Sequence, residues 1–115
     1  MTRQEFTIKI AKLIVQMEAE GDIPVMDWGL RNTLVQRDLY EQGKSKCDGI
    51  VKKSAHQLGI ALDIYLSDKS GKIIYDVDAK GNEEFKKRVL YWHSVWDKQF
   101  EGDRRIDWDA PHFEG

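Results

Sequence analysis

Two long segments of the chain repeat apolar residues every three or four positions, as amphipathic helices do. The first begins where Thr2 and Glu5 stand in the spacing of a capping box, and Gly21 supplies its end. The second begins at the capping residue Asn82 and ends at Gly102. The positions that we expect to be buried are Phe6, Ile10, Leu13 and Met17 in the first helix, and Phe85, Val89, Trp92, Trp96 and Phe100 in the second.

The centre of the chain follows a different period, with side chains that alternate between two faces of a strand over residues 60–66. Residues 68–71 predict a turn, so that residues 72–77 can pair back as a hairpin. One face of the strand carries Ile60, Leu62, Ile64 and Leu66, and the other carries Ala61, Asp63 and Tyr65.

Two shorter elements complete the pattern. Residues 23–30 predict a strand, and residues 32–42 predict a helix that ends at Gly43, with Leu34, Val35 and Leu39 as its apolar positions. Because helices and strands do not alternate regularly, the sequence favours an α+β fold with a small antiparallel sheet flanked by helices.

Size and charge narrow the class of protein. The 115 residues fit one domain, which we expect to span 1–115. The formal net charge of −2, with scattered lysines and arginines, argues against a nucleic-acid binder, which needs a concentrated basic face. The single cysteine, Cys47, excludes an intrachain disulfide and a cysteine-rich metal site.

The N-terminal segment does not have the features of a secretory signal, because charged residues interrupt its apolar positions and no small-residue cleavage site follows. No stretch approaches the roughly 20 apolar residues that a membrane span requires. We therefore expect the chain to be made as a soluble protein in the cytoplasm.

Asp63 is the first residue that indicates a functional site, because it places a carboxylate in a strand whose other residues are typical of a protein core. A buried carboxylate needs a partner, and a metal ion is one such partner. His56 lies seven residues earlier, a spacing that would put it on the opposite face of a continuous strand. Gly59 offers a place for the backbone to bend, which can bring both side chains to one point.

A second group of chemical residues lies in the segment 109–114. Pro111 excludes a helix interior there, and a turn followed by a short strand would place Asp109 close to His112. Two histidines, one carboxylate and an open position for water form a recognised catalytic zinc set. A carboxylate that is not a ligand, such as Asp109, can move protons. Spacing alone leaves a structural role open for each histidine, and His93, without an acidic residue at ligand spacing, is assigned such a role.

The pattern S-x-H-x-x-G-x-A-x-D over residues 54–63, followed by D-x-P-H-F-E over residues 109–114, resembles a known family of zinc peptidases. The family comprises D-alanyl-D-alanine carboxypeptidases and L-alanyl-D-glutamate endopeptidases, and this chain is most similar to its short phage endolysins and their bacterial cell-wall relatives. The segment 28–31, together with Gln36, Leu39, Tyr40, Gln42 and Gly43, resembles the family's G-Y-R…Q…L-Y-x-x-G stretch. The resemblance implies a fold of the hedgehog and DD-peptidase type.

The resemblance also implies a metal site and its acid–base group. It assigns Zn2+ to His56, Asp63 and His112, and it makes Asp109 the general base and then the general acid. It further implies that the catalytic residue Arg31 faces the cleft, where a guanidinium can hold a substrate carboxylate or steady an oxyanion.

Two further residues are candidates for substrate binding. The hydroxyl of Ser54 could bind substrate or could instead stabilise a turn. The side chain of Gln36 could bind substrate or could instead pack between a helix and the sheet. The sequence departs from the family at Leu30, Asn32 and Arg104, which bears on substrate preference rather than on the proposed ligands.

These motifs favour an endopeptidase that cuts the peptidoglycan stem peptide at the L-Ala–D-Glu bond. Two alternatives are a D-alanyl-D-alanine carboxypeptidase and a zinc-stabilised binding module without catalysis; Asp109 argues against the latter, because a structural site does not need it. We expect a monomer that binds neither nucleic acid nor a membrane, and that reaches the cell wall after release by a phage holin-type route.

Overall fold

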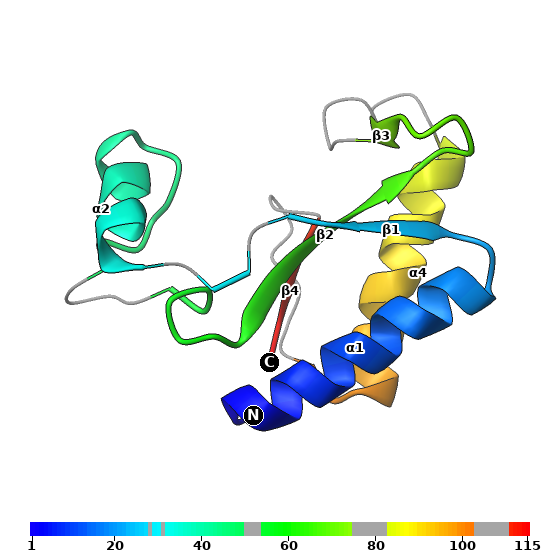
Figure 1. Cartoon of the computed structure of the whole chain (residues 1–115), viewed down its shortest axis with the longest axis horizontal. Helices are drawn as coiled ribbons and strands as arrows, with labels where there is room; N and C mark the ends of the chain where they lie inside the picture. Colours follow the sequence, from blue (N-terminus) through cyan, green and yellow to red (C-terminus); the bar gives the residue numbers. More distant parts are fainter. Residues whose placement is uncertain (28, 31, 50–53, 75–82, 103–110) are drawn as a thin grey trace.

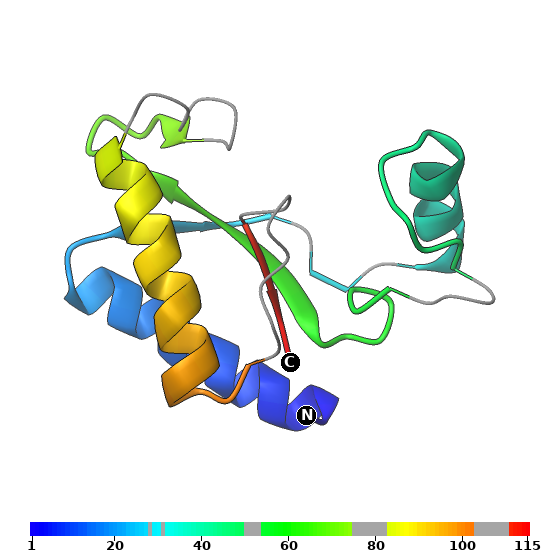
Figure 2. The ribbon, with the colours of Figure 1, turned by 180° about the vertical axis from the view of Figure 1, so that it is seen from behind.

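The computed structural model describes residues 1–27, 29–30, 32–49, 54–74, 83–102 and 111–115. Three helices and four strands within these residues form the α+β fold that the sequence predicts. Helices α1 and α4 pack together beside the strands, whereas α2 stands apart at one end of the molecule (Figures 1 and 2). The elements are α1 (Arg3–Ala19), β1 (Ile23–Met26), α2 (Thr33–Glu41), β2 (Ala61–Ser67), β3 (Ile73–Ile74), α4 (Glu83–Gln99) and β4 (His112–Glu114).

Strand β2 is the centre of the antiparallel sheet. It pairs with β1 along one edge, and with β3 and β4 along the other. In the β2–β4 register Leu62 lies opposite Phe113, and Asp63 lies opposite His112. The predicted alternation is confirmed, because Leu62 and Phe113 face the core and Asp63 and His112 therefore face the other side of the sheet.

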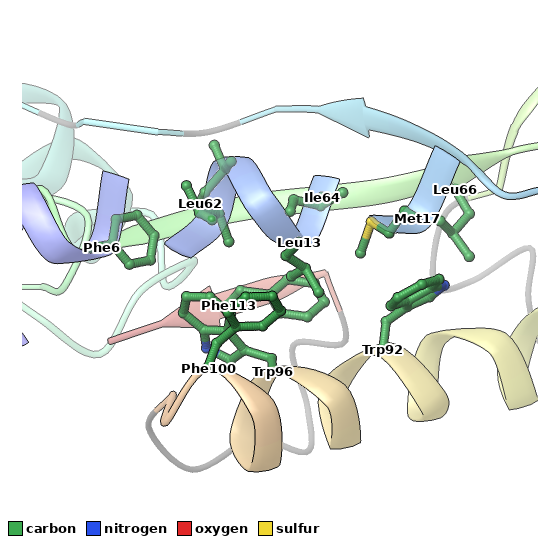
Figure 3. Packing of buried hydrophobic residues seen from close by; sticks show 11 residues of the cluster. Phe6, Leu13, Met17, Leu62, Ile64, Leu66, Trp92, Trp96, Phe100 and Phe113 are labelled. Atoms are coloured by element: carbon green, nitrogen blue, oxygen red, sulfur yellow. The ribbon is translucent and has the colours of Figure 1, made fainter. Parts of the chain in front are cut away.

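The core lies between the two long helices and the sheet, and Figure 3 shows the aromatic rings of α4 meeting the apolar residues of α1 and β2 there. Both predicted helical stripes are confirmed. Fully burying a side chain of this size contributes about 1.5–3 kcal/mol to stability. The stripe residues in the core are Phe6, Ile10, Leu13, Met17, Trp92, Trp96 and Phe100, with Phe85 and Val89 partly buried against them.

A polar contact joins the end of α1 to α4. The carboxylate of Asp22 accepts hydrogen bonds from the Trp92 indole at 2.6 Å and from the Arg88 guanidinium at 2.9 Å. The hydrogen bond with Asp22 raises the pKa of Arg88 above its ordinary value. This contact holds α4 against the turn between α1 and β1.

Helix α2 differs from its prediction in what it buries. Asn32 caps it as expected, because the Asn32 side chain accepts a hydrogen bond from Val35 N at 2.8 Å. Leu34 is 78% exposed, however, and the fully buried side chain is that of Gln36. The reason is that α2 packs against its own following loop, where the Gln36 amide donates to Ser45 Oγ and to the Cys47 carbonyl, at 2.7 and 2.8 Å.

Three predicted boundaries also change or remain untested. Strand β1 ends at Met26 rather than at residue 30. Asn82 and residues 75–77 of the predicted hairpin lie outside the described residues. Helix α4 ends at Gln99, before Gly102, and the residue in the left-handed conformation is Glu101, with φ of 57°.

Gly102 has a different role from the helix stop that its sequence position suggested. A Cβ atom at this position would overlap the indole of Trp96. Gly102→Ala is therefore expected to destabilise the protein by about 1–3 kcal/mol, as overpacking of a core does. Chemical denaturation measures this loss, and Gly29→Ala is the control, since its Cβ would lie at an ordinary 3.5 Å from Leu62. Equal stabilities of the two variants would contradict the prediction.

No helix in the described part of the chain combines the length and the apolar character needed to cross a bilayer.

Candidate metal centre

The side chains of His56, Asp63 and His112 meet on the face of the sheet opposite the core. His56 Nε2 lies 3.2 Å from Asp63 Oδ1 and 3.2 Å from His112 Nδ1, and His112 Nδ1 lies 3.4 Å from Asp63 Oδ1. All three side chains are buried. One atom from each therefore points to a common centre, as a metal site requires.

His56 reaches this centre because the backbone turns before β2. Gly59 has φ of +73°, a conformation that favours glycine, and its N–H donates to the His56 carbonyl at 3.2 Å. The predicted bend at Gly59 is confirmed, and it overcomes the seven-residue spacing that would separate His56 from Asp63 in a continuous strand.

His112 reaches the centre through strand pairing. A turn at Pro111 precedes the three-residue strand β4, as the sequence predicts. Ile64 N–H donates to the Pro111 carbonyl at 2.9 Å, so hydrogen-bonded positions flank the pair formed by Asp63 and His112. Side chains of such a pair lie close together, because the Cα atoms of non-hydrogen-bonded pairs are about 4.5 Å apart.

Each imidazole has a second contact that holds its orientation. His56 Nδ1 lies 2.9 Å from the Gly29 carbonyl, and His112 Nε2 lies 3.2 Å from Glu114 Oε1. If these outer nitrogens carry the protons, His56 Nε2 and His112 Nδ1 keep free electron pairs, and both of these atoms face Asp63. Such outer partners typically orient histidines that bind metals.

The spacing of the three inner atoms fits one ion. Ligands about 2.0–2.1 Å from a tetrahedral zinc ion lie about 3.3 Å from one another, which is the separation seen between the inner atoms. Asp63 Oδ1 is buried, and neither of its contacts with the imidazoles has the geometry of a hydrogen bond. A bound cation would satisfy this oxygen, so the residues present fit a metal.

The electrostatics of Asp63 favour the ionised ligand form. Burial, the largest influence, raises the pKa of its carboxyl, but the contacts with His112 and His56, together with the charge that these imidazoles carry when protonated, outweigh burial and hold the pKa at about 2. The carboxylate is therefore ionised at neutral pH, and a divalent cation would supply the neighbouring positive charge when the two imidazoles are neutral.

The structure gives Glu114 a role that the sequence had not assigned, since it appeared there only as part of a motif. Its position two residues after His112 in a strand places both side chains on one face, which was the available signal. The carbonyl of Gly29 had no such signal, because a backbone contact 27 residues away in sequence leaves no trace in residue type.

Glu114→Gln is expected to weaken metal binding about 10- to 100-fold, the usual effect of losing an outer partner of a ligand. The amide can still accept a hydrogen bond but lacks the charge that makes the imidazole a stronger ligand. Competition with a chromogenic chelator measures the affinity, and Glu84→Gln on the exposed start of α4 is the control. An unchanged affinity in Glu114→Gln would show that its carboxylate does not support His112.

Of the remaining predicted residues, the structure describes Ser54, Gln36 and His93 but not Arg31 and Asp109. Ser54 Oγ accepts a hydrogen bond from Gln57 N at 3.2 Å, within the turn that carries His56. Gln36, a residue of α2, is fully buried and donates hydrogen bonds to the loop that follows the helix. His93 is also buried and stacks on Phe113 with ring centroids 4.2 Å apart. Arg31 and Asp109 lie outside the described residues, so their roles stay predictions.

Fold and site together define a small α+β domain with a buried histidine–aspartate–histidine cluster that can hold a metal ion. Over 98 residues the chain is 33% identical to the peptidoglycan L-alanyl-D-glutamate endopeptidase CwlK of Bacillus subtilis (strain 168). The alignment covers 78% of this chain and 59% of that protein, so the chain spans less than two thirds of its relative. No family model matches the chain. The similarity supports the peptidase family that the motifs indicated.

Proposed function

We propose that this chain is a metal-dependent peptidase of the carboxypeptidase and endopeptidase family described above, and that it hydrolyses the L-Ala–D-Glu bond of the peptidoglycan stem peptide. The observation that carries the proposal is the convergence of His56 Nε2, Asp63 Oδ1 and His112 Nδ1 at ligand spacing. The similarity to an endopeptidase with this specificity supports the choice of substrate.

His56, Asp63 and His112 would hold the ion, and the mixed nitrogen and oxygen donors favour zinc. A zinc ion in such a site polarises a carbonyl group and lowers the pKa of a bound water to about 7. The Gly29 carbonyl and the Glu114 carboxylate keep the two imidazoles aimed at the centre. These contacts are made before substrate arrives, so the ligand geometry needs little rearrangement.

Asp109 would take the proton of the attacking water and deliver it to the leaving amine, which is the work of a general base and then a general acid. The guanidinium of Arg31 would hold a substrate carboxylate or stabilise the oxyanion. The D-glutamate side of the bond carries carboxylates, which suits a fixed guanidinium donor.

Digestion of purified peptidoglycan tests the proposal. The zinc-loaded protein is expected to release stem peptides, and mass spectrometry should find new carboxyl ends at L-Ala and new amino ends at D-Glu. A chelator should stop the release, and added zinc should restore it. Release of free D-Ala without stem peptides would instead indicate the carboxypeptidase activity. If the zinc-bound protein cleaved nothing, the non-catalytic binding module would be the remaining alternative.

A further inference from the structure

Strand β4, which carries His112 and Glu114, has one edge that does not face β2. Gly115 N–H donates to the Ile60 carbonyl at 2.9 Å, and hydrogen-bonded positions alternate along an antiparallel pair. The backbone of Phe113 therefore faces β2, and the backbone of Glu114 faces the other edge. With three residues, β4 has few backbone hydrogen bonds of its own to fix its position.

The indole of Trp96 covers this edge. Its Nε1 atom donates a hydrogen bond to the Glu114 carbonyl at 2.8 Å, and the residue is 1% exposed. The ring is held by an edge contact with Phe6 at 5.8 Å and by the close approach of Gly102. The packing leaves the Trp96 ring little freedom to move. Its N–H therefore holds the Glu114 carbonyl in one position, since a buried indole N–H keeps its hydrogen-bond partner.

Helix α4 also holds the core face of β4. The ring of Phe113 is stacked on His93, at 4.2 Å and with an angle of 5° between the planes. It also meets the edge of Trp96 at 6.4 Å. Phe113 lies between His112 and Glu114 in the strand, so these contacts set the plane from which both neighbouring side chains project toward the opposite face.

We propose that Trp96 is a positioning residue for the candidate metal centre. Its indole N–H acts through the Glu114 carbonyl to fix where β4 lies, and thereby where His112 Nδ1 meets His56 Nε2 and Asp63 Oδ1. The inference rests on the proposed metal site. Its physical basis is that a ligand displaced by a fraction of an ångström loses affinity, so a three-residue strand that pairs with one strand among the described residues benefits from a further support.

Helix α4 offers a matched pair of variants. Trp92 and Trp96 are both fully buried, and each donates its indole N–H to an acceptor on another element. The acceptor of Trp92 is Asp22 at the end of α1, whereas that of Trp96 is the Glu114 carbonyl beside the site. Trp92→Phe and Trp96→Phe therefore each remove one indole donor, and the bond lost in Trp92→Phe is the stronger of the two, because its acceptor is a carboxylate.

We expect Trp96→Phe to weaken Co2+ and Zn2+ binding about 5- to 10-fold, which corresponds to the loss of one hydrogen bond. It should also alter the visible spectrum of bound Co2+, which reports ligand geometry. Trp92→Phe should change the affinity less than about twofold, although the bond that it loses, to a carboxylate, is at least as strong. Equal affinities in the two variants would overturn the inference, while failure of the wild-type protein to bind either metal would instead overturn the proposed function.

The wild-type protein gives a second test if Trp96→Phe does not fold. Titration with Zn2+ should shift the indole N–H resonance of Trp96 in a proton–nitrogen correlation spectrum, because its acceptor belongs to the strand that carries a ligand. The Trp92 resonance, identified by its loss in Trp92→Phe, should move little. Equal shifts of the two resonances, or none at Trp96, would contradict the positioning role.

Discussion

His56→Ala is expected to weaken zinc binding by more than about 100-fold, and to abolish peptidoglycan hydrolysis at zinc concentrations that saturate the wild-type protein. Losing an outer partner of a ligand already costs about 10- to 100-fold in metal affinity, and the loss of a direct ligand exceeds that. His56 Nε2 lies within 3.2 Å of both other inner atoms, so its removal leaves two of the three donors that the described residues bring to the centre. Chelator competition and elemental analysis of the purified proteins measure the effect.

Stability gives an independent reading of the same loss. A ligand that binds only the folded state stabilises it by about 2.7 kcal/mol at a concentration 100 times its Kd. Zinc should therefore raise the unfolding temperature of the wild-type protein and leave that of His56→Ala unchanged. Leu58→Ala, at a half-exposed position in the same turn, is the control and should respond like wild type. Stoichiometric zinc in His56→Ala would rule out this ligand set.

The convergence of His56, Asp63 and His112 was predictable because local signals in the sequence agreed with the resemblance to the peptidase family. A carboxylate at Asp63 in an apolar alternation marked an unusual strand position. Gly59 marked the bend that brings His56 round, and Pro111 marked the turn that begins β4. These features depend on the side-chain pattern of one strand and on the backbone preferences of glycine and proline, which a sequence shows directly.

Contacts between distant backbone segments were not predictable in the same way. The Gly29 carbonyl that holds His56, and the Glu114 carbonyl that accepts from Trp96, depend on tertiary placement and not on residue type. Helix α2 shows a related limit, because the sequence marked Leu34 as one of its apolar positions, yet Leu34 is 78% exposed. The helix instead buries Gln36 against its own loop, so an amide replaces the apolar side chain as the buried residue.

Asp109→Asn is expected to lower the rate of stem-peptide hydrolysis about 100- to 10,000-fold and to leave zinc affinity within about twofold of wild type. Asparagine keeps the size of the side chain but cannot accept the proton of the attacking water. The separation of the two effects matters, because His56→Ala removes metal and activity together, whereas Asp109→Asn should remove activity alone. Single-turnover assays with zinc-loaded protein measure the rate, and Asp107→Asn is the control for a lost charge nearby. If Asp109→Asn lost its zinc, Asp109 would be a ligand. If it kept full activity, another group would carry the proton from the attacking water to the departing amine, because hydrolysis still requires this transfer.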